Sequence, residues 1–196
     1  MDRETRKFWQ QRRREMLRRD RLAGRGAFND APITKVLLGL MVLAWLVMNF
    51  FSGTLAVVLS GPAGGVLTYV LSALYPGGLL GLLFEGVFVW IVGSAIEPMT
   101  RWWQYLVVFF GSAFIAGAVE HLASVAGAGA SLAAFGLAGA YVRVMMSHHM
   151  EGAVRWALIL LLFNLVLSGF QPLAMIGILT AFGAGFVLAV AVQIDR

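Results

Sequence analysis

Six apolar segments, each close to the length that crosses a lipid bilayer, constrain the fold of this chain more than any other feature. A helix needs about 20 residues to cross ~30 Å of hydrocarbon. The chain has 196 residues, of which 60% are hydrophobic and only 13% are charged. The apolar segments lie at about 33–51, 79–96, 102–119, 128–146, 154–170 and 172–193. The sequence therefore predicts an all-α membrane protein, a bundle of six transmembrane helices.

The stretch 52–78 is apolar but contains many helix-breaking residues. Its glycines and prolines include Gly53, Gly61, Pro62, Gly64, Gly65, Pro76, Gly77 and Gly78. Irregular backbone cannot face lipid, because its polar groups would lack hydrogen-bond partners. We therefore predict an irregular or partly helical first loop at the membrane interface rather than a seventh span.

The charged residues divide the chain into a basic N-terminal arm at 1–32 and a membrane domain at 33–196. The arm holds 10 of the 15 Lys and Arg residues and 5 of the 10 Asp and Glu residues, so the whole formal charge of +5 arises there. Such an arm is more typical of contact with anionic lipid or with an acidic partner than of nucleic-acid binding. No nucleic-acid partner is expected.

The remaining basic residues predict how the bundle is oriented. They are Lys35, Arg101, Arg143, Arg155 and Arg196, and in a six-span chain all of them fall on the side of the N-terminal arm. Loops rich in Lys and Arg stay in the cytoplasm. We therefore expect a protein of the cytoplasmic (inner) membrane with both termini in the cytoplasm.

The fourth apolar segment contains the run GASLAAFGLAGAY at 129–141. This run resembles the fourth transmembrane helix of the rhomboid family of intramembrane serine proteases, in which the Ser of a Gly-x-Ser-Gly motif is the nucleophile. Ser131 stands at the nucleophile position, and Leu132 replaces the second Gly of the motif. In the second helix, Gly93 and Glu97 also keep the family pattern. The resemblance covers nearly the whole membrane domain and implies a rhomboid-like bundle.

The other catalytic positions of the rhomboid family are changed in this chain. Gly81 occupies the position of a His and Glu85 that of an Asn, and in the family these two side chains help to stabilise the oxyanion. Phe182, in the last apolar segment, occupies the position of the catalytic His. The resemblance therefore implies an incomplete catalytic set, with Ser131 as a vestigial nucleophile.

Without a His at position 182, Ser131 lacks the general base that a serine protease needs. A Ser hydroxyl is a poor nucleophile unless a base lies within hydrogen-bond reach, and Phe182 cannot accept its proton. Removing the base of a serine protease lowers turnover by a factor of about 10⁶. His121 is an alternative base, but a His at a helix end in contact with water is the simpler interpretation.

We therefore expect a non-catalytic, rhomboid-like membrane protein that binds transmembrane partners, as a subunit or an assembly factor of a membrane complex. The alternative is a divergent intramembrane serine protease that uses Ser131. No cofactor and no metal site are expected, because Glu151 is the only obvious further ligand beside His148 and His149.

Small residues recur at intervals of three and four in the fourth and sixth apolar segments. They are Gly129, Ala133, Gly136 and Ala140 in the fourth, and Ala181, Gly185 and Ala189 in the sixth. Small residues at this spacing let transmembrane helices approach closely. We predict that these two helices pack against each other.

Glu85 is the only charged residue well inside a predicted span. An ionisable group at this depth is a candidate functional residue. The favoured interpretation is a protonated or hydrogen-bonded carboxyl group that faces the bundle interior, with Ser131 as its partner. A proton or cation pathway would need a chain of polar groups, which the spans lack.

The charge distribution yields a test of the topology. The chain contains no Cys, so single cysteines can be introduced without background labelling. We expect Ser52→Cys and Ser168→Cys variants to react with a membrane-impermeant maleimide added to intact cells. Labelling of these positions only after the membrane has been opened would contradict the six-span topology.

Overall fold

The computed structural model describes residues 31–51, 64–123, 129–148 and 172–194, together with the single positions 152, 155, 159 and 162. The basic arm up to residue 30 and most of the predicted span at 154–170 lie outside the described residues. Every regular element within the described residues is a helix. The predicted all-α class is therefore confirmed.

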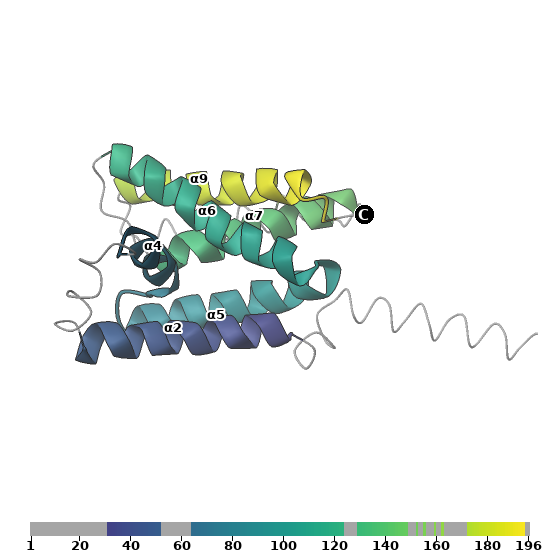
Figure 1. The fold of residues 1–196 in the computed structure, drawn as a ribbon. Coiled ribbons are helices and arrows are strands. Elements are labelled where there is room, and N and C mark those ends of the chain that lie inside the picture. The colour runs from purple at the N-terminus through teal and green to yellow at the C-terminus, as the bar shows by residue number, and fades with distance from the viewer. Residues whose placement is uncertain are drawn as a thin grey trace, which may run out of the picture.

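The described helices form a bundle with two sides (Figure 1). They are α2 (Pro32–Phe50), α4 (Gly64–Leu74), α5 (Leu79–Ile96), the 3-10 helix η1 (Glu97–Met99), α6 (Trp102–Leu122), α7 (Gly129–Ser147) and α9 (Pro172–Ala191). α2 packs along α5 on one side, and α6, α7 and α9 pack together on the other. α5 contacts α7 and so joins the two sides, while α4 lies at one end of the bundle.

Among the described residues, four segments are helical, long and apolar enough to cross a membrane. They are Pro32–Phe50, Leu79–Met99, Trp102–Leu122 and Gly129–Ser147. The last helix, α9, is also apolar and has 20 residues. These helices match the predicted spans to within about three residues at each end. The predicted first loop is partly helical, because α4 lies within it.

The start of α2 is capped by a residue from a distant part of the chain. Ala31 at the N-cap position offers no side-chain hydrogen bond, so the first amides of α2 need another acceptor. The carboxylate of Glu97 accepts hydrogen bonds from the backbone N–H of Ile33 at 2.7 Å and of Thr34 at 2.9 Å. It also accepts one from the Thr34 hydroxyl at 2.7 Å. A carboxylate at this position also matches the positive end of the helix dipole.

This capping group connects three helices at one point. The Thr34 hydroxyl lies 3.1 Å from the hydroxyl of Tyr105, which is fully buried on α6. Gly93 on α5 makes room for both groups, because a Cβ there would overlap the Tyr105 hydroxyl and crowd Thr34. Gly93 and Glu97 therefore serve one purpose, which is to hold α2, α5 and α6 together through buried polar groups.

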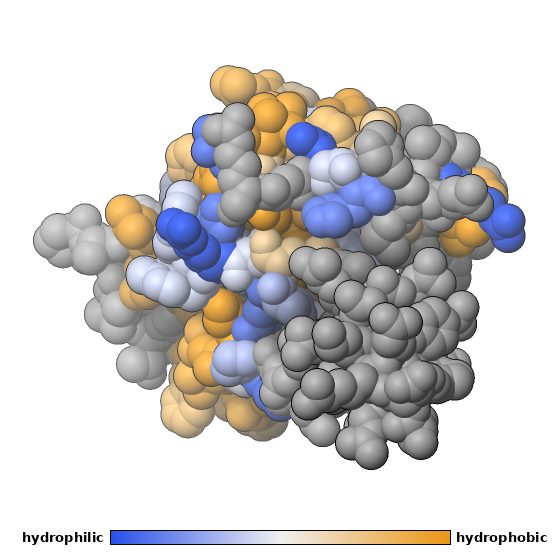
Figure 2. Space-filling model, turned by 90° about the vertical axis from the view of Figure 1, so that its right-hand side faces the viewer, coloured by the Kyte–Doolittle hydropathy of each residue, from blue (hydrophilic) through white to orange (hydrophobic). Residues whose placement is uncertain are grey.

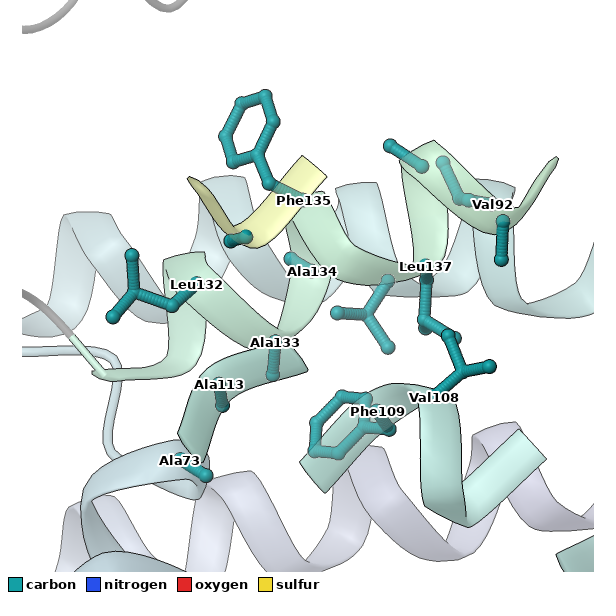
Figure 3. Close-up of a cluster of buried hydrophobic side chains, with 14 of the residues drawn as sticks. Ala73, Val92, Val108, Phe109, Ala113, Leu132, Ala133, Ala134, Phe135 and Leu137 are labelled. Atoms are coloured by element: carbon teal, nitrogen blue, oxygen red, sulfur yellow. The ribbon is translucent and has the colours of Figure 1, made fainter. Parts of the chain in front are cut away.

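The core of the bundle centres on α7. All residues from Leu132 to Ala140 are buried, and they pack against apolar side chains of α4, α5, α6 and α9. Figure 3 shows Ala133 of α7 in the same part of the core as Ala113 of α6 and Ala73 of α4. With small side chains on several helices, the backbones approach closely, as is typical of helices in lipid.

Several buried polar groups of the described residues lie at one end of the bundle. This end contains the start of α2, the end of α5, the start of α6 and the ends of α7 and α9. Gln104 in the first turn of α6 donates a hydrogen bond to the carbonyl oxygen of Val192, which follows α9, at 2.7 Å. Figure 2 looks onto this end and shows hydrophilic residues across it. Lys35, Arg101 and Arg143 all belong to the helix ends that meet here.

The capping contact predicts a specific loss of stability. Replacing Glu97 by Gln removes the charge and one acceptor oxygen, and we expect the free energy of unfolding to fall by roughly 1–3 kcal/mol. Titration of the purified protein with a denaturing detergent measures this change. Glu85→Gln is the matched control, because Oε2 of Glu85 has no hydrogen-bond partner in the described structure. Equal stability of the two variants would contradict the capping role of Glu97.

Candidate functional site at the crossing of α7 and α9

The candidate site is organised by the close crossing of α7 and α9. A Cβ at Gly185 of α9 would overlap the backbone of Gly136 on α7. A Cβ at Gly139 of α7 would in turn overlap the carbonyl group of Phe182 on α9. The two backbones therefore touch on both sides of the crossing, and neither glycine can carry a side chain without moving a helix.

The small residues singled out in the sequence do not all face the same helix. Ala133, Ala140, Ala181 and Ala189 are almost completely buried. Gly129 lies against the carbonyl oxygen of Ser72 on α4, and Gly136 lies against the Ser112 hydroxyl on α6. The small residues of α7 thus allow close approach of three neighbouring helices, α4, α6 and α9, rather than of α9 alone. Gly139, absent from the predicted packing set, is one of the closest contacts to α9.

Ser131 lies in the first turn of α7 and is half-buried. This turn is fixed by α4, because the backbone N–H of Ala130 donates a hydrogen bond to the Tyr75 carbonyl oxygen at 3.4 Å. His121, the alternative base, is exposed near the end of α6 and lines a cavity together with Gly129. Ser131 does not line that cavity. The structure therefore does not place His121 and Ser131 around a common space.

His148 lies at the other end of α7 from Ser131. Seventeen residues separate the two, which corresponds to about 25 Å of helix. Nδ1 of His148 lies 2.9 Å from the carbonyl oxygen of Val144, so the ring is held at its own helix end. Within the described residues, no group of three His, Cys, Asp or Glu side chains could hold a metal ion.

Phe182 is partly buried and packs against the core. It contacts the main apolar core and also the pair Val142 and Met145 on α7. Val142 follows Ser131 by eleven residues, or about 16 Å along the helix. The ring is therefore integrated into the packing of α7 and α9.

Gly81, at the position of the family's oxyanion His, has no room for any side chain. A Cβ at this residue would overlap the carbonyl oxygen of Pro76, in the turn that precedes α5. The amide of Gly78 in the same turn donates a hydrogen bond to that carbonyl oxygen at 2.9 Å, which holds the oxygen in place. A backbone carbonyl therefore occupies the place that a side chain of residue 81 would need.

Glu85 is partly buried on α5. Its Oε2 atom is buried and has no hydrogen-bond partner in the part of the chain that the structure describes. The hydrogen bond between Glu85 and Ser131 stays a prediction, because the unpaired atom is Oε2 alone. An unpaired polar atom in an apolar surrounding is costly.

The sequence reasoning did not identify Glu120 as a buried residue. It lies within α6 and is only 5% exposed, so Glu85 is not the only carboxyl group inside the membrane helices. Gly177 on α9 admits it, because a Cβ there would overlap Oε1 of Glu120. The signal was present in the sequence, since Ala113, Ala116 and Glu120 follow one another at helical spacing of three and four.

The fold and this site define a class, an all-α membrane protein whose central helix carries a Ser on its first turn and small residues in the turns that follow. The family model of the Rhomboid domain matches residues 63–194. Because this match covers most of the chain, the chain belongs to the rhomboid family. No curated protein and no solved structure matches the chain significantly.

The crossing geometry predicts which glycines tolerate a methyl group. We expect Gly139→Ala to lower the free energy of unfolding by roughly 1–3 kcal/mol, because the added carbon meets the Phe182 carbonyl group. Gly183→Ala, on α9, is the matched control, since a Cβ at Gly183 meets nothing within 4 Å. Unfolding curves in detergent compare the two variants. A Gly139→Ala protein as stable as the Gly183→Ala protein would contradict the close crossing.

Proposed function

We propose that this member of the rhomboid family is not a protease and that it binds transmembrane segments of other membrane proteins. Its role is that of a subunit or an assembly factor of a membrane complex. The observation that carries the proposal is the Pro76 carbonyl oxygen, which fills the place of a side chain at Gly81. The backbone, as well as the residue type, therefore opposes a side chain at the position of the family's oxyanion His.

The absence of a base on α9 supports the first half of the proposal. In the family, the residue at the Phe182 position accepts the proton of the nucleophile. Phe182 instead packs in the core against α7. Without a base, the hydroxyl of Ser131 is a weak nucleophile.

The oxyanion side of the site supports the same conclusion. Removing one oxyanion donor from a serine protease costs roughly 3–4 kcal/mol of transition-state stabilisation. Here Gly81 offers no donor, and an ionised Glu85 would repel a developing oxyanion. Ser131 is then a residue of the first helical turn, where Ser is common because it bonds to free backbone amides.

The exposed side of α5 supports the binding half of the proposal. A stripe of large apolar side chains runs along this helix at helical spacing and faces outward. Its members are Leu80, Leu83, Phe84, Val87 and Ile91, each more than half exposed. Glu85 lies beside this stripe with an unpaired oxygen. A transmembrane partner that packs on the stripe and donates a hydrogen bond to Glu85 would satisfy this oxygen.

The orientation follows from the same proposal. We place the end of the bundle that carries Lys35, Arg101 and Arg143 in the cytoplasm of a cell with a cytoplasmic (inner) membrane. The N-terminal arm would then lie beside that membrane surface, where its basic residues can contact anionic lipid or an acidic partner.

Photo-crosslinking in the membrane tests both halves of the proposal at once. A photoreactive amino acid replaces Val87 on the α5 stripe, and the same residue at Leu43 of α2, which is equally exposed, is the control position. Each is made with Ser131 intact and with Ser131→Ala. We expect a full-length partner captured at position 87, in equal amounts with and without Ser131, and a weaker adduct when Glu85 is replaced by Leu.

Two results would contradict the proposal. A partner captured in shortened form with Ser131, and at full length only with Ser131→Ala, would identify a divergent intramembrane serine protease. Adducts at position 87 that are no stronger than those at position 43, or that do not depend on Glu85, would refute binding at α5.

A further inference from the structure

A cavity of about 450 Å³ lies between α4, α6 and the first turn of α7, and its lining does not include Ser131, Gly81, Glu85 or Phe182. This volume is within the usual range of small-molecule sites. One continuous face of α6, from Phe110 to His121, forms a wall of the cavity. Side chains of α4 form the opposite wall, and Gly129 and Leu132 of α7 close the third side.

The cavity has a buried acidic group and an apolar entrance. Glu120 lines it and is only 5% exposed, whereas Val66, Tyr69 and Phe114 around it are each at least half exposed. Glu120 also contacts α9, because a Cβ at Gly177 would overlap its Oε1 atom. A site with this polarity suits an amphiphile whose polar group enters and whose apolar part stays toward the lipid.

The carboxylate of Glu120 determines which kind of polar headgroup the cavity can bind. A buried carboxylate is costly in a membrane protein unless a cation pairs with it. None of the residues that line the cavity is Lys or Arg. Three aromatic rings, those of Tyr69, Phe110 and Phe114, line it together with Glu120, and the rings of Tyr69 and Phe114 are 5.3 Å apart. A carboxylate beside aromatic rings is the usual protein surrounding of an ammonium group.

We propose that this cavity binds the ammonium headgroup of a single phospholipid of the ethanolamine class, with Glu120 as the partner of the ammonium group. A primary ammonium group donates N–H hydrogen bonds to a carboxylate, which a choline headgroup cannot do. His121, exposed at the rim, can donate a hydrogen bond to the lipid phosphate. The acyl chains lie along the exposed apolar side chains of α4 and α6. This site does not depend on whether Ser131 is catalytic.

Delipidated full-length protein in mild detergent provides the test. Native mass spectrometry and the midpoint of thermal unfolding are measured after addition of didecanoyl phospholipids that carry an ethanolamine, a choline or a glycerol headgroup. We expect one molecule of the ethanolamine lipid to bind and to raise the unfolding midpoint. Glu120→Gln is expected to weaken this binding roughly tenfold or more, because the charge-assisted hydrogen bond is lost.

A second variant fills the cavity without touching Glu120. Gly117 lines the cavity, and a Cβ there meets nothing within 4 Å, so Gly117→Leu places its side chain in open space. We expect this variant to fold and to lose the lipid. Gly39→Leu on the outer face of α2 is the matched control, because a Cβ at Gly39 also meets nothing within 4 Å. This control is expected to bind as the unmodified protein does.

Three outcomes would overturn the proposal. The first is equal binding of all three headgroups, which would indicate a site for acyl chains alone. The second is tighter binding of the choline or the glycerol lipid. The third is unchanged binding of the ethanolamine lipid to the folded Gly117→Leu protein, which would place the lipid elsewhere.

Discussion

The arrangement of the bundle depends on one carboxylate that caps a helix of a different part of the chain. Glu97 lies just after α5. Its carboxylate accepts hydrogen bonds from the backbone amides at the start of α2, more than sixty residues earlier in the chain. Thr34 is buried within the bundle, where water does not reach its amide, so the alternative to this contact is an unpaired donor. The Thr34 hydroxyl extends the contact to Tyr105 on α6. These hydrogen bonds fix how α2, α5 and α6 are shifted along their axes relative to one another at this end of the bundle.

Packing at the centre is decided by backbones rather than by large side chains. α7 meets α4 at Gly129, α6 at Gly136, and α9 at both Gly136 and Gly139. Transmembrane helices gain little from burying apolar groups, because lipid is equally apolar, and close contact supplies the attraction instead. Because α7 has small residues on three sides, it can pack closely against three neighbouring helices at the centre of the bundle. The same feature places the start of α7, and with it Ser131, next to the end of α4.

Much of the fold could be predicted from the sequence because a membrane imposes simple rules. Twenty apolar residues give a helix, and small residues at intervals of four give close contacts. Contacts between distant residues could not be predicted in this way. Nothing local identifies Glu97 as the cap of α2, or assigns Gly129 to α4 instead of α9. Glu120 lies just beyond the predicted span at 102–119, and the residue that makes room for it, Gly177, lies on another helix.

The turn before α5 has a consequence for how this chain could change over time. A family member that has only lost a His can regain it by a single substitution, because the space for the ring is still there. At Gly81 that space is occupied by the carbonyl oxygen of Pro76, which belongs to the main chain. Regaining a side chain at this position requires the turn at 76–78 to adopt a new path first. At position 81 the path of the backbone, and not only the residue type, therefore limits which substitutions the chain can accept.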